Sequence, residues 1–379
     1  MSQQDMDFRH RPQLSRRQVV QAGLAGALVG GLGGIGLLAV PGAARAQGAA
    51  RTIRILRASP LTLPVWSVMY LAEDLGFLKE EGIAVEHIGL NSGPAAMTAL
   101  LAGEGAADLS PPGEMLAAVA KGQSACAIFS LSGFTACTLI VSKQFAGKQK
   151  ITAQSPLKER EAAIRAGKGS LRFGITTPGS LTDALTRMVL KQVGLDAARD
   201  ATILPFQSLG NGLAALSNNA IDGFMSFSPL TEQGMLEFGA VPLLRIASDD
   251  IPAGKRLQGQ LIEARPSDIQ ADPDLYAALV RACLRAQRII VETPDVARDK
   301  LRRTRFDFVK EEIWPMVWQN ELPTFKSPFV ARESLQAWID SGLVGGNPDP
   351  AKFPYDKVID MRFVKEGLAK IGWTPPEAG

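Results

Sequence analysis

Strand-like and helical runs alternate along the chain from residue 51 onwards, and this alternation limits the possible fold more than any other feature. Residues 52–57 alternate in character as a strand does, residues 66–75 have the spacing of a helix, and residues 82–88 form a second strand-like run. Successive strands and helices build a sheet with helices packed on its faces. The order of these runs therefore predicts an α/β fold.

A second unit with the same plan begins after a polar, charge-rich stretch at residues 143–170. Residues 171–175 form a strand-like run, residues 176–180 form a turn of small residues, and Leu181 and Leu185 then lie on one face of a helix. The chain shows no short repeat of the kind that builds a solenoid. Two α/β units joined in one chain are predicted.

The first 46 residues have the pattern of an export signal. Arg16 and Arg17 precede a weakly apolar stretch at residues 22–40 that is rich in Gly and Ala, and residues 44–46 supply small side chains for cleavage. Paired arginines in this position predict a twin-arginine signal, which exports folded proteins. A membrane anchor is the alternative, but the many glycines dilute the hydrophobicity of the stretch. No other segment approaches the length of an apolar membrane span.

The charge of the chain argues against nucleic acid or an anionic membrane as a partner. The 41 basic and 38 acidic residues give a formal net charge of +3. The first 46 residues contain all of this excess, so the remainder is neutral. A neutral body offers no electrostatic basis for binding a polyanion.

Three cysteines are too few and too scattered for a disulfide scaffold or a zinc site. None lies beside the predicted cleavage site, so there is no signal for a lipid anchor. Cys126 and Cys137 could form a disulfide in an oxidising compartment, or both could be buried as small apolar residues. No metal and no cofactor are expected.

Several segments in the two units resemble a known family. Residues 72–85 and 99–108 resemble signature segments of the solute-binding proteins that serve the uptake of nitrate, sulfonates, taurine and thiamine precursors. Residues 174–180, 194–196 and 215–223 follow the order of that family in the second unit. No single motif is specific, but the order and spacing of the set are.

The resemblance covers residues 52–300 well and the C-terminal 80 residues only loosely. Two departures are visible: one extra residue separates Gly103 from Asp108, and Asn219 stands where a glycine is usual.

The resemblance implies a two-lobed periplasmic binding protein fold of type II, in which each lobe is a doubly wound sheet. The first lobe would comprise residues 51–140 and 263–379, and the second would comprise residues 143–258. Two crossing strands, near residues 138–142 and 259–264, would form the hinge.

The function implied by the resemblance is that of a monomeric periplasmic protein without enzymatic activity. It would deliver a small solute to the membrane permease of an ABC importer. The neutral charge and the hydroxyl-rich loops suit an anionic or zwitterionic solute, such as a sulfonate, a nitrate-like oxyanion or a carboxylate. Aromatic acids fit the aromatic residues of the loops equally well.

In open α/β sheets, ligands bind beyond the carboxyl ends of the strands, where helix N-termini present free N–H groups. Gly133–Phe134 and Ser226–Phe227 occupy corresponding positions after their strands in the two units. The predicted solute-binding residues are Leu63, Trp66, Ser92, Gly93, Ser110, Pro111, Gly133, Phe134, Thr177, Gly179, Ser180, Ser226 and Phe227.

The turn at Thr177–Ser180 carries the strongest signal. Gly179 allows the backbone to approach a ligand closely, and the hydroxyl groups of Thr177 and Ser180 can donate hydrogen bonds. Ser180 and Asp183 also fit a capping box, which would make the turn purely structural.

The other predicted residues each have a structural alternative. Ser92 and Gly93 could simply begin a helix, and Ser110 and Pro111 lie in a loop stiffened by proline. Glu114, just beyond that loop, could receive a solute amine or could only favour the helix dipole. Trp66, like Leu63, Phe134 and Phe227, could line a pocket or belong to the core.

An exported enzyme is the main alternative function, and a thiamine-precursor protein on the same fold is a variant of it. After the predicted signal the chain has one histidine, His87, and it lacks G-x-S-x-G, H-E-x-x-H and metal-spaced His/Cys clusters. A thiamine-precursor synthase needs histidines that are missing here. A regulator's sensory domain is a second alternative, but the export signal stands where its DNA-binding module would be.

Overall fold

Five strands form the first sheet, in the order β2-β1-β3-β10-β4. The computed structural model describes residues 50–344, 349 and 353–377, so the predicted export signal lies outside the described residues. The bounds of the strands are β1 Arg51–Arg57, β2 Ile83–Gly89, β3 Ala107–Ser110, β4 Cys126–Ser130 and β10 Leu261–Ala264. β1 pairs in parallel with β2 and β3, whereas β10 runs antiparallel between β3 and β4. β3, β4 and β10 are buried along their whole length, as expected of strands covered on both faces.

The second sheet repeats this arrangement, with the order β7-β6-β8-β5-β9. Its strands are β5 Thr138–Val141, β6 Leu171–Ile175, β7 Ala201–Pro205, β8 Gly223–Ser226 and β9 Val241–Arg245. β6 pairs in parallel with β7 and β8, and β5 runs antiparallel between β8 and β9. In each sheet one antiparallel strand is inserted into an otherwise parallel set. The predicted α/β fold with two sheets is confirmed.

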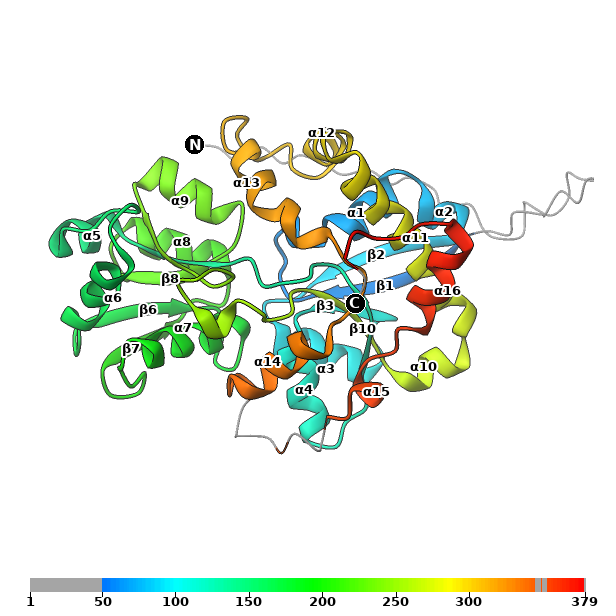
Figure 1. The fold of residues 1–379 in the computed structure, drawn as a ribbon, viewed down its shortest axis with the longest axis horizontal. Coiled ribbons are helices and arrows are strands. Elements are labelled where there is room, and N and C mark those ends of the chain that lie inside the picture. Colours follow the sequence, from blue (N-terminus) through cyan, green and yellow to red (C-terminus); the bar gives the residue numbers. More distant parts are fainter. Residues whose placement is uncertain (1–49, 345–348, 350–352, 378–379) are drawn as a thin grey trace, which may run out of the picture. The chain divides into compact units, whose positions relative to one another are not determined.

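The helices divide into two sets according to the sheet they accompany (Figure 1). Those of the second sheet are α5 Lys143–Gln149, α6 Leu157–Ala166, α7 Leu181–Gln192, α8 Leu209–Ser217 and α9 Leu230–Phe238. Those on the side of the first sheet are α1 Ser67–Asp74, α2 Phe77–Glu80, α3 Gly93–Ala102, α4 Pro112–Ala120, α10 Pro266–Ala271, α11 Pro273–Glu292, α12 Pro294–Thr304, α13 Trp314–Glu321, α14 Arg332–Asp340, α15 Tyr355–Val358 and α16 Arg362–Ile371. Short 3-10 turns lie at Pro64–Trp66, Pro252–Gly254 and Leu322–Phe325.

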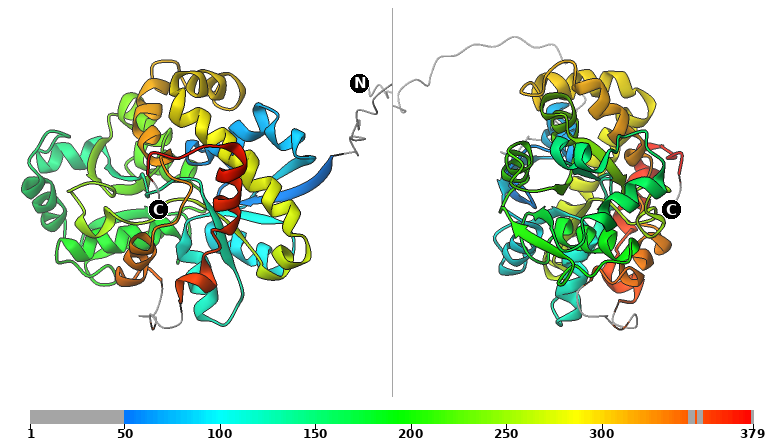
Figure 2. Two further views of the ribbon diagram at one scale, coloured as in Figure 1. Left: turned by 45° about the vertical axis from the view of Figure 1, so that its right-hand side comes forward. Right: turned by 90° about the vertical axis from the view of Figure 1, so that its left-hand side faces the viewer.

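The C-terminal third of the chain returns to the first sheet. Figure 2 shows the yellow to red helices, from α11 onwards, around the blue and cyan strands. α11 packs against α1 and α16. Its buried residues Leu279, Cys283 and Ile290 recur at helical spacing, which places one apolar stripe of this long helix against the core.

Two segments pass between the sheets, and neither is a strand. Residues 131–137 connect β4 to β5, and residues 246–260 connect β9 to β10. They are joined by hydrogen bonds: the backbone N–H of Thr135 donates to the carbonyl of Leu257 (2.9 Å), and the side chain of Gln258 donates to the carbonyl of Ser132 (2.8 Å). The two connections therefore run together as a cross-linked pair.

The structure differs here from the predicted lobe boundary and from the predicted hinge strands. Residues 138–140 were expected in the first lobe, but β5 is hydrogen-bonded on both sides within the second sheet, to β8 and β9. β10 is likewise bonded on both sides within the first sheet. Each of these strands therefore belongs to one sheet, and the segments that pass between the sheets are residues 131–137 and 246–260.

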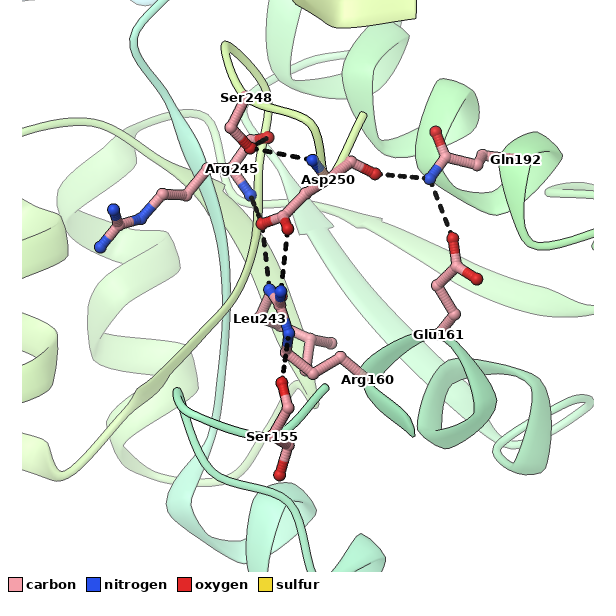
Figure 3. Close-up of polar contacts among 8 residues, drawn as sticks. All are labelled: Ser155, Arg160, Glu161, Gln192, Leu243, Arg245, Ser248 and Asp250. Atoms are coloured by element: carbon pink, nitrogen blue, oxygen red, sulfur yellow. Dashed lines mark hydrogen bonds and ion pairs between the residues drawn. The ribbon is translucent and has the colours of Figure 1, made fainter. Parts of the chain in front are cut away.

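A polar network fastens the longer connection to the helices of the second sheet (Figure 3). The guanidinium of Arg160, on α6, donates two hydrogen bonds to the carboxylate of Asp250, at 3.0 and 2.8 Å. The backbone N–H of Arg245 donates to the same carboxylate (3.1 Å), and Gln192 of α7 donates to the Asp250 carbonyl (2.7 Å). Burial alone would raise the pKa of Asp250, but these donors and the Arg160 charge hold it below its usual value.

Replacing Arg160 with Ala is expected to lower the free energy of unfolding by ~1 kcal/mol, because Asp250 would keep a partly buried charge without its cation. The lowered pKa of folded Asp250 means that this contribution is present at neutral pH and is lost as the pH falls through that pKa. Urea unfolding at pH 7 and pH 3 measures both effects. Arg165→Ala is the matched control on the same helix, because Arg165 makes only a longer, half-exposed contact with Glu161 (3.7 Å). Equal losses in the two variants would contradict the role of the network.

All three cysteines are buried free thiols. Cys126 begins β4 in the first sheet, whereas Cys137 directly precedes β5 in the second. Burial raises the pKa of Cys126 to about 12. Of the two alternatives for Cys126 and Cys137, the structure has the buried thiols and not the disulfide.

Candidate functional site

A small cavity lies where the loops at the carboxyl ends of both sheets meet. It is lined by Ala58, Ser59, Pro60, Leu63, Val65, Trp66, Asn91, Ser92, Gly93, Pro111, Glu114, Thr176, Ser180, Leu181, Thr182, Ser208, Leu209, Phe227 and Gln260. Its volume is about 60 Å³, far below the ~300–1,000 Å³ of pockets that hold drug-sized ligands. With the walls in this position, the cavity admits a molecule of only a few heavy atoms.

Four helices begin at this cavity: α3, α4, α7 and α8. Three of them start with a serine whose hydroxyl oxygen accepts a hydrogen bond from a backbone N–H in the first turn. Ser92 accepts from Ala95 (3.4 Å), Ser180 from Asp183 (3.5 Å) and Ser208 from Asn211 (3.2 Å). These hydroxyls therefore serve as helix caps, and the N-terminal ends of the helices give the cavity a positive potential.

Glu114 brings a carboxyl group into this positive region. It is the third residue of α4 and only 8% exposed, and its Oε2 atom has no hydrogen-bond partner. A Cβ atom on Gly93, the first residue of α3, would lie 2.2 Å from Oε1 of Glu114, so the glycine is needed for the carboxyl to fit. Burial raises the pKa of Glu114 to about 8, against the lowering effect of its own backbone N–H and that of Leu181. Leu181 is the first residue of α7, so Glu114 reaches from the first sheet's side to the second's.

Two further buried carboxyl groups lie behind Glu114. Asp108 of β3 stands opposite Glu263 of β10 in the strand register, and its carboxylate accepts a hydrogen bond from the hydroxyl of Ser110 (2.8 Å). Burial raises the pKa of Asp108 to about 7. Burial also raises the pKa of Glu263 well above its usual value, and the charges of Asp108 and Glu114 add to that effect. Neither carboxyl oxygen of Glu263 has a partner.

Trp66 forms an apolar wall of the cavity. Its ring is 1% exposed, and its Nε1 atom has no hydrogen-bond partner. The guanidinium of Arg57 lies 5.4 Å from the ring centroid and donates a hydrogen bond to the hydroxyl of Tyr70 (2.7 Å). Arg57 is not part of the lining. Arg57 is therefore engaged with the ring of Trp66 and the hydroxyl of Tyr70, and its side chain lies outside the cavity lining.

The structure brings together about half of the residues predicted from the sequence. Those in the cavity lining are Leu63, Trp66, Ser92, Gly93, Pro111, Ser180 and Phe227. The remaining ones that the structure describes outside it are Ser110, Gly133, Phe134, Thr177, Gly179 and Ser226. For the residues of both groups, contact with a solute stays a prediction.

Local structure explains why the second group lies elsewhere. Ser110 and Ser226 are the last residues of β3 and β8, and both are fully buried. Gly133 lies in the connection between the sheets, where its N–H donates to the carbonyl of Thr324 (2.6 Å). The N–H of Gly179 donates to the carboxylate of Asp183 (2.9 Å), so the turn at Thr177–Ser180 is held by its own helix.

Gln260 and Ser208 line the cavity but were absent from the predicted set. Ser208 begins a helix after β7, which is the same signal that identified Ser92, and it could have been found in that way. Gln260 has no comparable local signal. It enters the site because β10 runs antiparallel to its neighbours, so the residue before this strand lies at the carboxyl ends of the others.

A larger groove of about 1,210 Å³ adjoins the cavity. It is bordered by residues of α3, α4, α7 and α14, and it shares Glu114, Ser180 and Leu181 with the cavity lining. These three residues therefore separate the inner space from an open approach.

His87 lies on β2 and pairs with Glu73 (3.1 Å), away from the cavity lining. Within residues 50–344, 349 and 353–377, no three His, Cys, Asp or Glu side chains are grouped in a way that would hold a metal ion. None of the helices in that part of the chain combines the length and hydropathy of a membrane span.

Solved structures with the same two-sheet arrangement define the class of fold. A ligand-binding component of an ABC-type import system from Staphylococcus aureus, with zinc bound, is 16% identical and has a TM-score of 0.64, covering 84% of this chain and 99% of that one. The alkanesulfonate-binding protein SsuA from Xanthomonas axonopodis pv. citri, bound to MOPS, is 16% identical with a TM-score of 0.61, covering 82% and 98%. The periplasmic nitrate-binding protein NrtA from Synechocystis PCC 6803 is 15% identical with a TM-score of 0.61, covering 84% and 89%. The chain thus has the periplasmic binding protein fold.

A comparison with protein-family models identifies the family within this class of fold. The model of the NMT1-like family matches residues 66–302, which include the second sheet, the first sheet apart from β1, and most of the cavity lining. The chain belongs to this family. No curated protein matches the chain in sequence. The predicted resemblance to nitrate- and sulfonate-binding proteins is confirmed by the family and by the structural neighbours.

Proposed function

We propose that this protein binds a small solute between its two sheets and delivers it to the permease of an ABC importer. The observation that carries the proposal is the cavity itself, because residues from the helix N-termini of both sheets line it together. A ligand held in this way contacts both lobes, which the chain itself connects through two non-strand segments. One solved structure of the same fold, from Staphylococcus aureus, is a ligand-binding component of an ABC-type import system.

The mechanism that follows is closure of the two lobes around the solute. A cavity of about 60 Å³ bordered by a wide groove is the expected form of a site whose walls approach each other. The residues 131–137 and 246–260 would bend during this motion. We further propose that the protein acts as a monomer in the periplasm after twin-arginine export, as the sequence predicts.

Binding without catalysis is the favoured activity. Among the described residues that line the cavity, Glu114 is the only one with an ionisable side chain. General acid–base or nucleophilic catalysis usually combines at least two such groups within hydrogen-bonding distance of each other. His87, the histidine considered for an enzyme, lies on β2 and pairs with Glu73.

A saturating solute is expected to raise the melting temperature by ~5 °C, because it binds the folded state alone. Thermal shifts can be measured with a panel of inorganic oxyanions, sulfonates, small carboxylates, amines and amino acids. A compound that stabilises the protein should also reduce the radius of gyration in small-angle scattering.

Leu209→Trp, which fills the cavity, should abolish the thermal shift. Leu236→Trp is the matched control, because Leu236 is 52% exposed on α9 and should leave the shift intact. A wild-type protein that no compound stabilises would contradict the proposed function.

A further inference from the structure

Glu114 occupies the position where helix N-termini would otherwise attract an anion from solution. Its carboxyl group lies against Gly93 at the start of α3, within the first turn of α4, and near the N–H of Leu181 at the start of α7. Three positive helix ends thus converge on one carboxyl group of the protein itself. When Glu114 is ionised, its own negative charge takes up the electrostatic attraction that these helix ends offer to an anionic ligand.

No lining cation compensates for this carboxyl group. Glu114 is the only ionisable residue in the described lining, and Arg57 lies over the Trp66 ring outside it. The groups that face Glu114 from β3 and β10 are Asp108 and Glu263, both carboxyls and both buried. An anion without hydrogen-bond donors would therefore meet an acidic end of the cavity.

The buried polar atoms that lack partners indicate what a solute has to offer. Oε2 of Glu114 and Oε1 of Gln260 are acceptors, and Nε1 of Trp66 is a donor. All three residues line the cavity and are more than nine-tenths buried. A buried polar atom without a partner costs free energy. A solute that donates to the Glu114 and Gln260 oxygens and accepts from Nε1 of Trp66 would satisfy all three.

We propose that Glu114 determines specificity by accepting a hydrogen bond from an N–H group of the solute, and that it excludes oxyanions that carry no such donor. This inference rests on the proposed function and narrows its solute class. A zwitterion or a small amine or amide meets the requirement, whereas nitrate or a simple alkanesulfonate does not. The sequence predicts an anionic or a zwitterionic solute, and the role proposed for Glu114 favours the zwitterionic one.

Matched compounds that differ by one amino group test the proposal. We suggest calorimetric titration with β-alanine against propionate and 2-aminoethanesulfonate against ethanesulfonate, with nitrate beside them. In the wild type, the amino member of a pair should bind roughly ten- to hundredfold more tightly. Above pH 8, where Glu114 is ionised, Glu114→Gln should remove that preference and should raise the affinity for ethanesulfonate, because a negative carboxylate no longer opposes the anion.

The pH profile gives a second readout that a merely structural role would not move. An ammonium group binds the ionised carboxylate, so the wild-type affinity should rise between pH 6 and pH 8 as Glu114 ionises, and it should level off above that range. Asp108 and Glu263 also titrate near this site, so the dependence assigned to Glu114 is the part lost in Glu114→Gln. Glu114→Asp should retain a weaker dependence of the solute affinity on pH.

Glu321→Gln is the matched control, because Glu321 is also fully buried with a pKa raised to about 8 but does not line the cavity. It should keep the preference for amino compounds. Wild-type protein that binds ethanesulfonate or nitrate as tightly as the amino compounds would overturn the role of Glu114 and leave the proposed function standing. Absence of binding by every compound, in the wild type and in the variants, would overturn the proposed function and this inference with it.

Discussion

Raising the pH from 5 to 8.5 is expected to lower the free energy of unfolding by ~4 kcal/mol or more. The cause is a set of buried carboxyl groups whose pKa values burial raises: Asp108, Glu114, Glu232, Glu263 and Glu321. In the unfolded chain these groups ionise near pH 4–4.5, whereas in the folded protein they keep their protons to higher pH. The folded state then binds more protons between these limits. The stability that these groups contribute is therefore complete below pH 4. It is lost as the pH rises through their raised pKa values, which are about 7 for Asp108 and about 8 for Glu114 and Glu321.

Glu232 and Glu321 show where such a group sits outside the cavity. Glu232 of α9 accepts hydrogen bonds from Ser228 (3.0 Å) and from Asn320 of α13 (2.7 Å). Glu321 follows Asn320, is fully buried, and has no partner for either carboxyl oxygen. Burial raises the pKa of Glu321 to about 8, and the charge of Glu232 adds to the rise. Both groups lie where the second sheet's helices meet those of the C-terminal third.

Urea unfolding at pH 5, 6.5 and 8.5 measures this dependence. Glu321→Gln should make the free energy of unfolding depend less steeply on pH. The expected reduction in slope is that of one titrating group, about 1.4 kcal/mol per pH unit over the range in which Glu321 titrates. That variant should be more stable than the wild type at pH 8.5 and similar at pH 5. A stability that stays level or increases over this range would show that these carboxyls ionise normally in the folded protein.

Replacing Gly259 with Ala is expected to lower the free energy of unfolding by ~3 kcal/mol. The added Cβ would lie 2.5 Å and 2.6 Å from the backbone carbonyl oxygens of Phe134 and Ser132, and 2.3 Å from the hydroxyl oxygen of Ser132. The backbone on both sides of this contact belongs to the two cross-linked connections between the sheets. Neither connection can move away from the added Cβ without breaking hydrogen bonds to the other. The glycine is what allows the two segments to run in contact.

Thermal and urea unfolding of Gly259→Ala can be compared with Gly147→Ala. Gly147 lies within α5, and its added Cβ would meet no atom within 4 Å. Alanine is the better helix former, so this control should gain ~0.5–1 kcal/mol. Gln260, the neighbour of Gly259, lines the cavity, and solute binding should therefore weaken in Gly259→Ala alone. A neutral effect of Gly259→Ala would mean that the connections move apart easily.

The local sequence pattern was enough to predict the strands and helices and some of the residues that line the cavity. A strand, a small-residue loop and a helix start can each be recognised within about ten residues, because alternation, glycine and cap residues act on neighbouring backbone. Ser92 and Ser180 were identified in this way, and both cap helices at the cavity. The same signal predicts Thr177 and Gly179, but the backbone N–H of Gly179 bonds to Asp183 of the helix that follows.

The sequence by itself determined the α/β class, the two units, the helix starts and the family resemblance, because each of these depends on residues close together in the chain. Only the tertiary structure decided which sheet holds β5 and β10, since those pairings join residue 138 to residues 226 and 245, and residue 263 to residue 108. The same holds for Glu114, which reads locally as a favourable residue in the first turn of α4. Its meeting with Gly93 and Leu181 inside one cavity depends on how three separate helices pack, and no local periodicity encodes that packing.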